Sequence, residues 1–271
     1  MPYLRYDSKD AEIGNGAKIE ESVKSERTKI ASQASQQSYV SLPVKNSYAE
    51  WTAVKSGSGV TMRFTLPDGN GGTGVKGSLD VYVNNKKVKT VKLDSFWMWQ
   101  YFNFGSGSPS DSAGAIGAFA FDEVHFLLDT PLKSGDKIKI QSTGAGGYEY
   151  GVDFLEIEDV PEAIEQPDNS VSVEEYGAVA YGEHGDRDTF DAAIASKNTA
   201  AFKQAVADAD KKGMDLYIPE GTYLLDGMWT IGAENMKITG AEFGTQIFSL
   251  QVKKFPVVAF QVETQMQREA Q

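Results

Sequence analysis

The chain contains no cysteine, and this absence excludes disulfide bonds, Cys-ligated zinc and catalysis by a thiol. Histidine is nearly as scarce, because His125 and His184 are too few for a metal cluster built on imidazoles. His125 lies in the apolar run FDEVHFLLDT, which has the composition of a strand, so we expect it to be hydrogen-bonded and structural. His184 lies in the polar loop YGEHGDRD and is expected to face water.

Positive charge and long apolar runs are also in short supply. Lys and Arg number 26 against 38 Asp and Glu, and the formal net charge of −12 argues against a nucleic acid or an anionic membrane as partner. No apolar run approaches the length of a transmembrane helix, and no signal-peptide pattern follows Met1. The 27 glycines, with many Ser, Asn and Thr residues, are typical of secreted β proteins rich in turns. We therefore expect a neutral or cationic ligand outside the cell.

The chain does contain a dense aromatic stretch, DSFWMWQYFNF, over residues 94–104. If strand alternation continues through it, Trp97, Trp99 and Tyr101 point to one face and Met98 to the other. Rings with polar neighbours suit sugars, whose C–H faces stack on aromatics while their hydroxyls bind amides and carboxylates. Such rings are also typical of a β-sandwich core. Both interpretations stay open, because some rings can be buried while others lie at a rim.

Residues 1–160 predict an antiparallel β-sandwich. Short runs such as QSYVSLPV, GVTMRFTLPD and VDFLEIEDV alternate or are rich in β-branched and aromatic residues, and no long helical period interrupts them. Asn84-Asn85 separates two of these runs and predicts a two-residue hairpin turn, since Asn tolerates positive φ. Trp51, within YAEWTAV, is expected in the core.

The pattern changes at residues 161–170, PEAIEQPDNS, which carry two prolines and predict a linker. Beyond the linker, a strand-like run and a polar loop precede a helix over AAFKQAVADADKKG. We expect Asn198 or Thr199 to cap this helix and Gly213 to stop it.

Residues 171–250 continue with short strands that end in Gly or Asn turns, as in the first coils of a right-handed parallel β-helix. A solenoid needs about three or more coils to bury a continuous core, and residues 251–271 form a polar, atypical tail without turn chemistry. The sequence therefore predicts an all-β protein. An antiparallel β-sandwich (jelly-roll) over residues 1–160 is followed by a partial right-handed parallel β-helix with one capping α-helix, the start of a truncated catalytic domain.

Two groups of motifs resemble known families. LRYDSKDAEIGNGAKI, QSYVSLPVKNSYAEWTAV and YGVDFLEIE resemble carbohydrate-binding modules of families six and thirty-five. VSVEEYGAVAYG, NTAAFKQAVADADKKGMDLYIPEGTYLL and MKITGAEFGTQI resemble the opening of the pectate-lyase-like β-helices. In tandem they look most similar to bacterial secreted α-1,3-glucanases and mycodextranases. The resemblance implies a polysaccharide partner, favours an α-glucan, and implies a secreted protein.

The resemblance also implies one structural calcium ion near the N-terminus. Carried over to this chain, its carboxylate ligands would be Asp7, Glu20 and Asp153, and Ca²⁺ prefers such an oxygen shell. Lys9 stands where the family often has a second carboxylate, so its ammonium could replace the ion as the counter-charge. Ordinary surface carboxylates at strand edges are the alternative. No organic cofactor is expected.

The sugar site implied by the resemblance lies in loops at one end of the sandwich. Trp97, Trp99 and Tyr101 are the best aromatic candidates, and Tyr148 and Tyr150, in the loop GAGGYEYG, are the other two. Packing within the loop is the alternative role for these two tyrosines.

Hydrolysis of a glycosidic bond generally needs two carboxylates that flank it. Asp186, Asp188 and Asp191 cluster in HGDRDTFDAA before the helix, where we expect a solvated loop with a minor stabilising effect on the helix N-terminus. The resembled enzymes take their catalytic aspartates from later coils.

The sequence thus predicts glucan binding by the N-terminal module of a secreted polysaccharide-degrading glycoside hydrolase whose catalytic domain is incomplete in this chain. One alternative is a complete small hydrolase that uses the three aspartates. Another is a structural or adhesive surface protein, and the oligomeric state stays open.

Overall fold

The computed structural model describes residues 3–102, 116–182 and 187–249, except positions 27, 71, 228, 230, 234, 242 and 243. The chain forms two compact units, the first over Met1–Val160 and the second beginning at Pro161. From residue 159 to residue 169 it has neither helix nor strand. The tail predicted over residues 251–271 lies outside the described residues. In the part that is described, no helix is long and apolar enough to cross a membrane.

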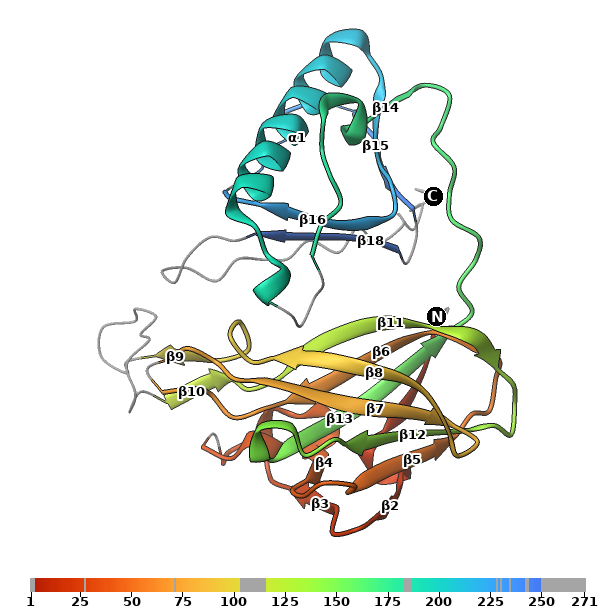
Figure 1. Cartoon of the computed structure of the whole chain (residues 1–271), viewed down its shortest axis with the longest axis vertical. Coiled ribbons are helices and arrows are strands. Elements are labelled where there is room, and N and C mark those ends of the chain that lie inside the picture. The colour runs from red at the N-terminus through yellow and green to blue at the C-terminus, as the bar shows by residue number, and fades with distance from the viewer. Residues whose placement is uncertain are drawn as a thin grey trace. The chain divides into compact units, whose positions relative to one another are not determined.

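The first unit is built from two antiparallel sheets (Figure 1). The larger has the order β11-β6-β13-β4-β3, with β1 also pairing with β13, and the smaller has the order β2-β5-β12-β7-β8. The strands of the larger sheet are β1 (Tyr3–Asp7), β3 (Lys18–Glu21), β4 (Ser38–Leu42), β6 (Gly57–Thr65), β11 (Asp122–Leu132) and β13 (Tyr150–Glu158). Those of the smaller are β2 (Glu12–Gly14), β5 (Tyr48–Thr52), β7 (Lys76–Val83), β8 (Lys86–Asp94) and β12 (Lys137–Ser142). A short antiparallel hairpin of β9 (Gln100–Phe102) and β10 (Ile116–Phe119) is also described.

The core of the first unit is made by the inward face of every long strand. In β12, KIKIQS, Ile138 and Ile140 are fully buried while the lysines that alternate with them are not, as the period of two requires. Trp51 of β5 belongs to the same core with 1% of its surface exposed, and its Nε1–H donates to the carbonyl of Asp7 at 2.9 Å. The predicted core position of Trp51 is confirmed.

The hairpin between β7 and β8 turns where the sequence predicts it. Asn84 and Asn85 have φ angles of 48° and 65°, the left-handed conformation that a two-residue turn of this kind requires. The two strands pair in antiparallel register from Lys76 opposite Asp94 to Val83 opposite Lys86.

A smaller apolar cluster lies on the other face of the larger sheet. Tyr39 of β4 alternates with the core residues Val40 and Leu42, so it points away from the core. Two short 3-10 turns, η2 (Ile30–Gln33) and η3 (Ser35–Gln37), lie next to it, and Phe121 packs edge-on against Tyr39 at 5.9 Å. This face is therefore partly covered by residues 30–37.

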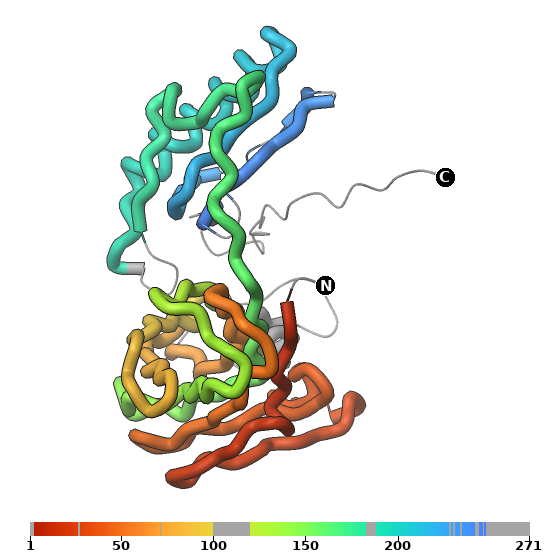
Figure 2. The backbone as a smooth tube through the Cα atoms, turned by 90° about the vertical axis from the view of Figure 1, so that its right-hand side faces the viewer, coloured from red at the N-terminus to blue at the C-terminus, as the bar shows by residue number. Residues whose placement is uncertain are grey.

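The second unit contains parallel pairing. Its strands are β14 (Ser170–Ser172), β15 (Asp215–Ile218), β16 (Gly221–Leu225), β17 (Ile238–Gly240) and β18 (Thr245–Ser249). Strands β14, β15 and β17 form one parallel sheet, and β16 pairs in parallel with β18. Helix α1 (Ala192–Lys212) lies beside these strands in both views, and its buried residues share one apolar cluster with them (Figures 1 and 2). Phe202 of the helix is fully buried and contacts the Tyr223 ring of β16 at 5.6 Å.

Helix α1 begins earlier than the sequence predicts. Asp191 is its N-cap and accepts the N–H groups of Ala193 at 2.8 Å and Ile194 at 3.0 Å. Asn198 is buried inside the helix, where its side chain bonds both the N–H and the carbonyl of Val179, at 2.7 and 2.9 Å. The predicted cap at Asn198 or Thr199 is wrong, because both residues lie within the helix. Asn198 bonds the main chain of Val179, and the Thr199 hydroxyl donates to the Ala195 carbonyl. The predicted stop is confirmed, since Gly213 caps the C-terminus at φ 64°.

The predicted β-rich class is confirmed, with antiparallel sheets and, among the described residues, one α-helix. The parallel sheets of the second unit are small, with three and two strands among the described residues.

Trp51 offers a direct test of the core. Trp51→Ala is expected to lower the free energy of unfolding by about 3–5 kcal/mol, because it opens a cavity and leaves the Asp7 carbonyl without its donor. Urea unfolding measures this loss. The exposed neighbour Thr52 provides the control, and Thr52→Ala is expected to change stability by less than about 0.5 kcal/mol. Equal stability of the two variants would contradict the core assignment.

Candidate functional site

The aromatic stretch does not continue as a strand. Strand β8 ends at Asp94, whose carboxylate accepts the N–H of Phe96 at 2.8 Å, and the Met98 N–H donates to the Ser95 carbonyl at 3.2 Å. This is a turn in which a short acidic side chain replaces strand pairing. The predicted alternation of Trp97 and Trp99 on one face is therefore wrong.

The rings around this turn have different surroundings. Met98 is buried with 2% exposed, and Trp99 donates from Nε1 to the Leu66 carbonyl at 2.9 Å while packing on the core. Trp97 is half-buried and meets the Phe96 ring edge-on at 4.9 Å. Tyr101 lies in β9, and its side chain is outside the described part of the structure.

The two predicted loop tyrosines also differ. Tyr150 is 0% exposed, donates from its hydroxyl to the Ala145 carbonyl at 2.7 Å and accepts the Ser78 N–H at 3.3 Å. Its ring is part of the core and offers no face to a sugar. Tyr148 is half-buried and packs against the same core.

A buried polar group surrounds Asp153, where β13 changes partners. Residues up to Val152 pair with β4, residues from Phe154 pair with β1, and the register with β6 shifts between them. Asp153 is the extra residue of this β-bulge, and a bulge re-aims the side chain that it carries. The carboxylate is 0% exposed, and the Ser35 N–H donates to its two oxygens at 3.0 and 2.9 Å.

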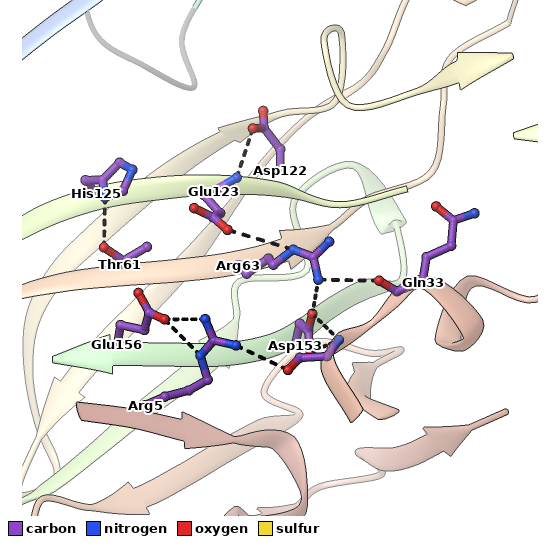
Figure 3. A network of polar contacts seen from close by, with 10 residues as sticks. Arg5, Gln33, Thr61, Arg63, Asp122, Glu123, His125, Asp153 and Glu156 are labelled. Carbon is purple, nitrogen blue, oxygen red and sulfur yellow. Dashed lines mark hydrogen bonds and ion pairs between the residues drawn. The ribbon is translucent and has the colours of Figure 1, made fainter. Parts of the chain in front are cut away.

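Arg63 supplies the positive charge at this carboxylate. From β6 its Nη1 donates to Asp153 and, at 3.4 Å, to the carbonyl of Gln33 (Figure 3). Its guanidinium also lies over the Phe121 ring, 4.6 Å from the centroid. Buried charges need such pairing, because an isolated carboxylate loses its hydration without compensation.

A second, more exposed ion pair lies beside the first. Arg5 of β1 donates from Nε to Glu156 at 2.8 Å and lies 3.9 Å from the centroid of the Phe154 ring. Arg63 lies 6.0 Å from the same ring. Arginine and aromatic groups thus connect β1, β13 and β6 on the face opposite the core.

Burial raises the pKa of Asp153 to about 6, and the nearby negative charge of Asp7 acts in the same direction. The Ser35 N–H and the Arg63 guanidinium oppose this rise in pKa by stabilising the ionised form. Burial also raises the pKa of Glu123, which lies beside Arg63. At neutral pH the Asp153 carboxylate is ionised and paired.

The predicted calcium ligands are not gathered around one point. The carboxylate oxygens of Asp153 accept hydrogen bonds from the Ser35 N–H and the Arg63 guanidinium. Glu20 is exposed on β3. Asp7 accepts the Gln36 amide on Oδ2 at 2.6 Å, while its Oδ1 is buried without a hydrogen bond. Among the described residues, no three His, Asp or Glu side chains could together hold a metal ion. With the Arg63 guanidinium on these oxygens, the donor set does not fit the expected ion.

Asp188 is exposed in the short turn η6 (Arg187–Thr189), and Asp191 caps helix α1. Asp186 and His184 lie outside the described residues. His125 contacts the Thr61 hydroxyl through Nδ1 at 2.8 Å, so its predicted hydrogen-bonded role is confirmed.

Sequence reasoning missed Arg63 and the turn at Ser35–Gln37. An arginine inside the apolar run GVTMRFTLPD is the signal that could have found the first. No sequence signal predicts the turn, because Gln36 and Gln37 adopt positive φ angles of 53° and 55°, which glutamine rarely does.

Comparison with known proteins identifies the relatives of this fold. The family described as "Alpha-1,3-glucanase catalytic domain D1" matches residues 1–160. The crystal structure of the Agl-KA catalytic domain is 49% identical with a TM-score of 0.77, aligned over 92% of this chain and 42% of that one. The catalytic unit of a thermostable GH87 α-1,3-glucanase from Streptomyces thermodiastaticus strain HF3-3 is 26% identical with a TM-score of 0.69, over 92% and 41% of the two chains.

A GH87 α-1,3-glucanase catalytic domain solved with nigerose is 19% identical with a TM-score of 0.65, over 89% of this chain and 40% of that chain, and at this identity it supports the fold alone. No curated protein sequence matches the chain. The chain spans about 42% of the length of the Agl-KA structure.

The fold and these relatives define the class as a β-rich domain of the kind found in the catalytic domains of α-1,3-glucanases. Within it, the chain belongs to the family of the α-1,3-glucanase catalytic domain D1.

This membership corrects the predicted function. The sequence predicts that residues 1–160 are a carbohydrate-binding module attached to an incomplete catalytic domain, but the family assigns these residues to the catalytic domain itself. The prediction is wrong because a β-sandwich with aromatic loops serves many functions, and its strand pattern does not distinguish a binding module from a catalytic subdomain.

The raised pKa of Asp153 predicts a pH dependence with a definite sign. The folded state binds the Asp153 proton more tightly than the unfolded state does. Protonation of Asp153 therefore contributes to the free energy of unfolding at about pH 4, and this contribution is lost as the pH rises to about 6. Asp153→Asn removes this titration. We expect the stability difference, wild type minus variant, to fall by up to about 3 kcal/mol over that range. Urea unfolding at several pH values measures it, and a difference that rises with pH would contradict the assignment.

Proposed function

We propose that the protein hydrolyses α-1,3-glucan. The observation that carries the proposal is the family match of residues 1–160 to the first domain of an α-1,3-glucanase catalytic domain. The identity of 49% to the Agl-KA catalytic domain over 92% of the chain supports it. The similar GH87 enzyme from Streptomyces thermodiastaticus is named for the same substrate linkage.

The chemistry is the cleavage of a glycosidic bond between neutral sugars. Such cleavage uses one carboxylic acid that protonates the leaving oxygen and one carboxylate that acts as base or nucleophile. A neutral glucan carries no charge that the net −12 of the chain would repel. Because a polymer of this kind is attacked outside the cell, we expect the protein to be secreted.

We further infer a finer architecture. Two packed antiparallel sheets support a jelly-roll type of sandwich for the first unit. In the second unit, β14, β15 and β17 pair in parallel, as do β16 and β18, and only Pro219 and Glu220 separate β15 from β16. Two parallel stacks joined by a short corner support the start of a right-handed parallel β-helix, in which each coil adds one strand to each stack.

Among the predicted sugar-binding rings, we propose Trp97 as the one that contacts glucan. Trp99 and Tyr148 pack against the core and Tyr150 is buried within it, whereas Trp97 is half-buried in the turn between β8 and β9. An indole with a partly open face can stack on the C–H face of a glucose ring.

The proposed activity is tested by incubating the purified protein with insoluble α-1,3-glucan and measuring the release of reducing sugar. Dextran and cellulose are the controls, because they present α-1,6 and β-1,4 linkages with the same sugar. We expect release from α-1,3-glucan alone. No release from it, or equal release from dextran, would contradict the proposed substrate.

The Trp97 contact is tested by retention on insoluble α-1,3-glucan. Trp97→Ala is expected to weaken retention by about 1–3 kcal/mol, by analogy with the stacking of a base on an aromatic ring. Its melting temperature is expected to change little, and Trp97→Phe, which keeps a ring, is the matched control. A large loss of stability without a selective loss of retention would show instead that the ring is part of the core.

A further inference from the structure

Arg63 occupies a position that is lined by oxygen atoms. Its Nη1 faces the Asp153 carboxylate and the Gln33 carbonyl, and its Nε lies 3.9 Å from Glu123 Oε1 (Figure 3). Carboxylates and a main-chain carbonyl are the ligand types that a hard cation such as Ca²⁺ takes in proteins. The group at their centre is a guanidinium that comes from the chain itself.

A second carboxylate lies close to the same point. Asp7 lies opposite Phe154 in the β1–β13 pairing, one residue from Asp153, and its charge contributes to the raised Asp153 pKa. The turn of Gln36 and Gln37 places the Ser35 N–H on Asp153 and the Gln36 amide on Asp7. Asp7 Oδ1 is buried and accepts no hydrogen bond. Both acids therefore accept hydrogen bonds from the same turn of residues 35–37.

A second basic side chain, Lys9, pairs with an acid of β3. Lys9 follows β1, and its Nζ contacts Glu21 Oε1 of β3 at 2.7 Å, next to the third predicted ligand, Glu20. Side chains of the chain itself thus neutralise the region where the resemblance implies an ion. Lys9 and Glu21 are largely exposed, whereas the side chain of Arg63 is 25% exposed and that of Asp153 is fully buried, so Arg63 carries the stronger interaction.

We infer that Arg63 is the fixed cation of a structural site at which an oxygen-bound ion such as calcium would otherwise hold β13 to the residue 33–37 segment. The contact between β13 and this segment is therefore independent of calcium. A guanidinium suits this place, since it keeps its charge at every physiological pH and is weakly hydrated, so it can lie over the Phe121 ring while it bonds Asp153. Removal of the Arg63 side chain is expected to leave a site that calcium can enter, with Asp153, Asp7 Oδ1 and the Gln33 carbonyl as ligands.

The experiment compares melting temperatures of the purified protein in excess EDTA and in millimolar calcium chloride. The wild-type melting temperature is expected to be the same in both. Arg63→Ala is expected to melt roughly 10 °C lower in EDTA, as when one partner of a buried ion pair is removed, and to regain several degrees in calcium. The matched control is Arg5→Ala, which also loses an aromatic contact and a carboxylate partner but at a more exposed pair. It is expected to lose roughly 2 °C and not to respond to calcium.

Three results would overturn the inference. They are a wild-type protein that EDTA destabilises, an Arg63→Ala variant as stable as Arg5→Ala, and an Arg63→Ala variant that calcium leaves unchanged. If Arg63→Ala is unfolded in EDTA, circular dichroism replaces melting as the readout. Folding on addition of calcium then supports the inference, and failure to fold contradicts it.

Discussion

The first unit depends on one buried carboxylate at a break in its larger sheet. Strand β13 pairs with β4 over one half and with β1 over the other, and Asp153 stands at the bulge between the two halves. Its charge is tolerated because Arg63 and the Ser35 N–H surround it. The loss of Arg63 would leave an uncompensated charge in the interior, at a cost of about 3–5 kcal/mol. The same contacts hold residues 33–37 over the outer face of the sheet, so the bulge organises the covering segment as well as the strands.

Function in this chain follows from family membership and not from a site that the fold displays by itself. A two-sheet sandwich with exposed rings serves equally as a binding module or as one part of a catalytic domain. The family match of residues 1–160 decides between these roles and excludes the binding-module prediction. It leaves the aromatic turn, in which Trp97 is half-buried, as a part of the catalytic domain.

Local turn and capping chemistry is predictable from this sequence, whereas the particular partners of most buried polar side chains are not. The Asn84-Asn85 turn and the Gly213 stop depend on backbone conformations that few residue types adopt, so they were predictable. Asn198 resembles a cap by its side-chain chemistry, but its actual partner is a main-chain segment elsewhere in the fold. Tyr150 and the pairing of Asp153 depend on distant residues in the same way, and no periodicity encodes them.

The Arg63 guanidinium occupies the space beside Asp153 in which an ion could otherwise bind. A high-resolution crystal structure of the protein grown in millimolar calcium tests it most directly. We predict that the Arg63 guanidinium lies between Asp153 and the Gln33 carbonyl, with no ion at that point. A calcium ion bound by Asp153 and Asp7, with Arg63 turned away, would contradict the account.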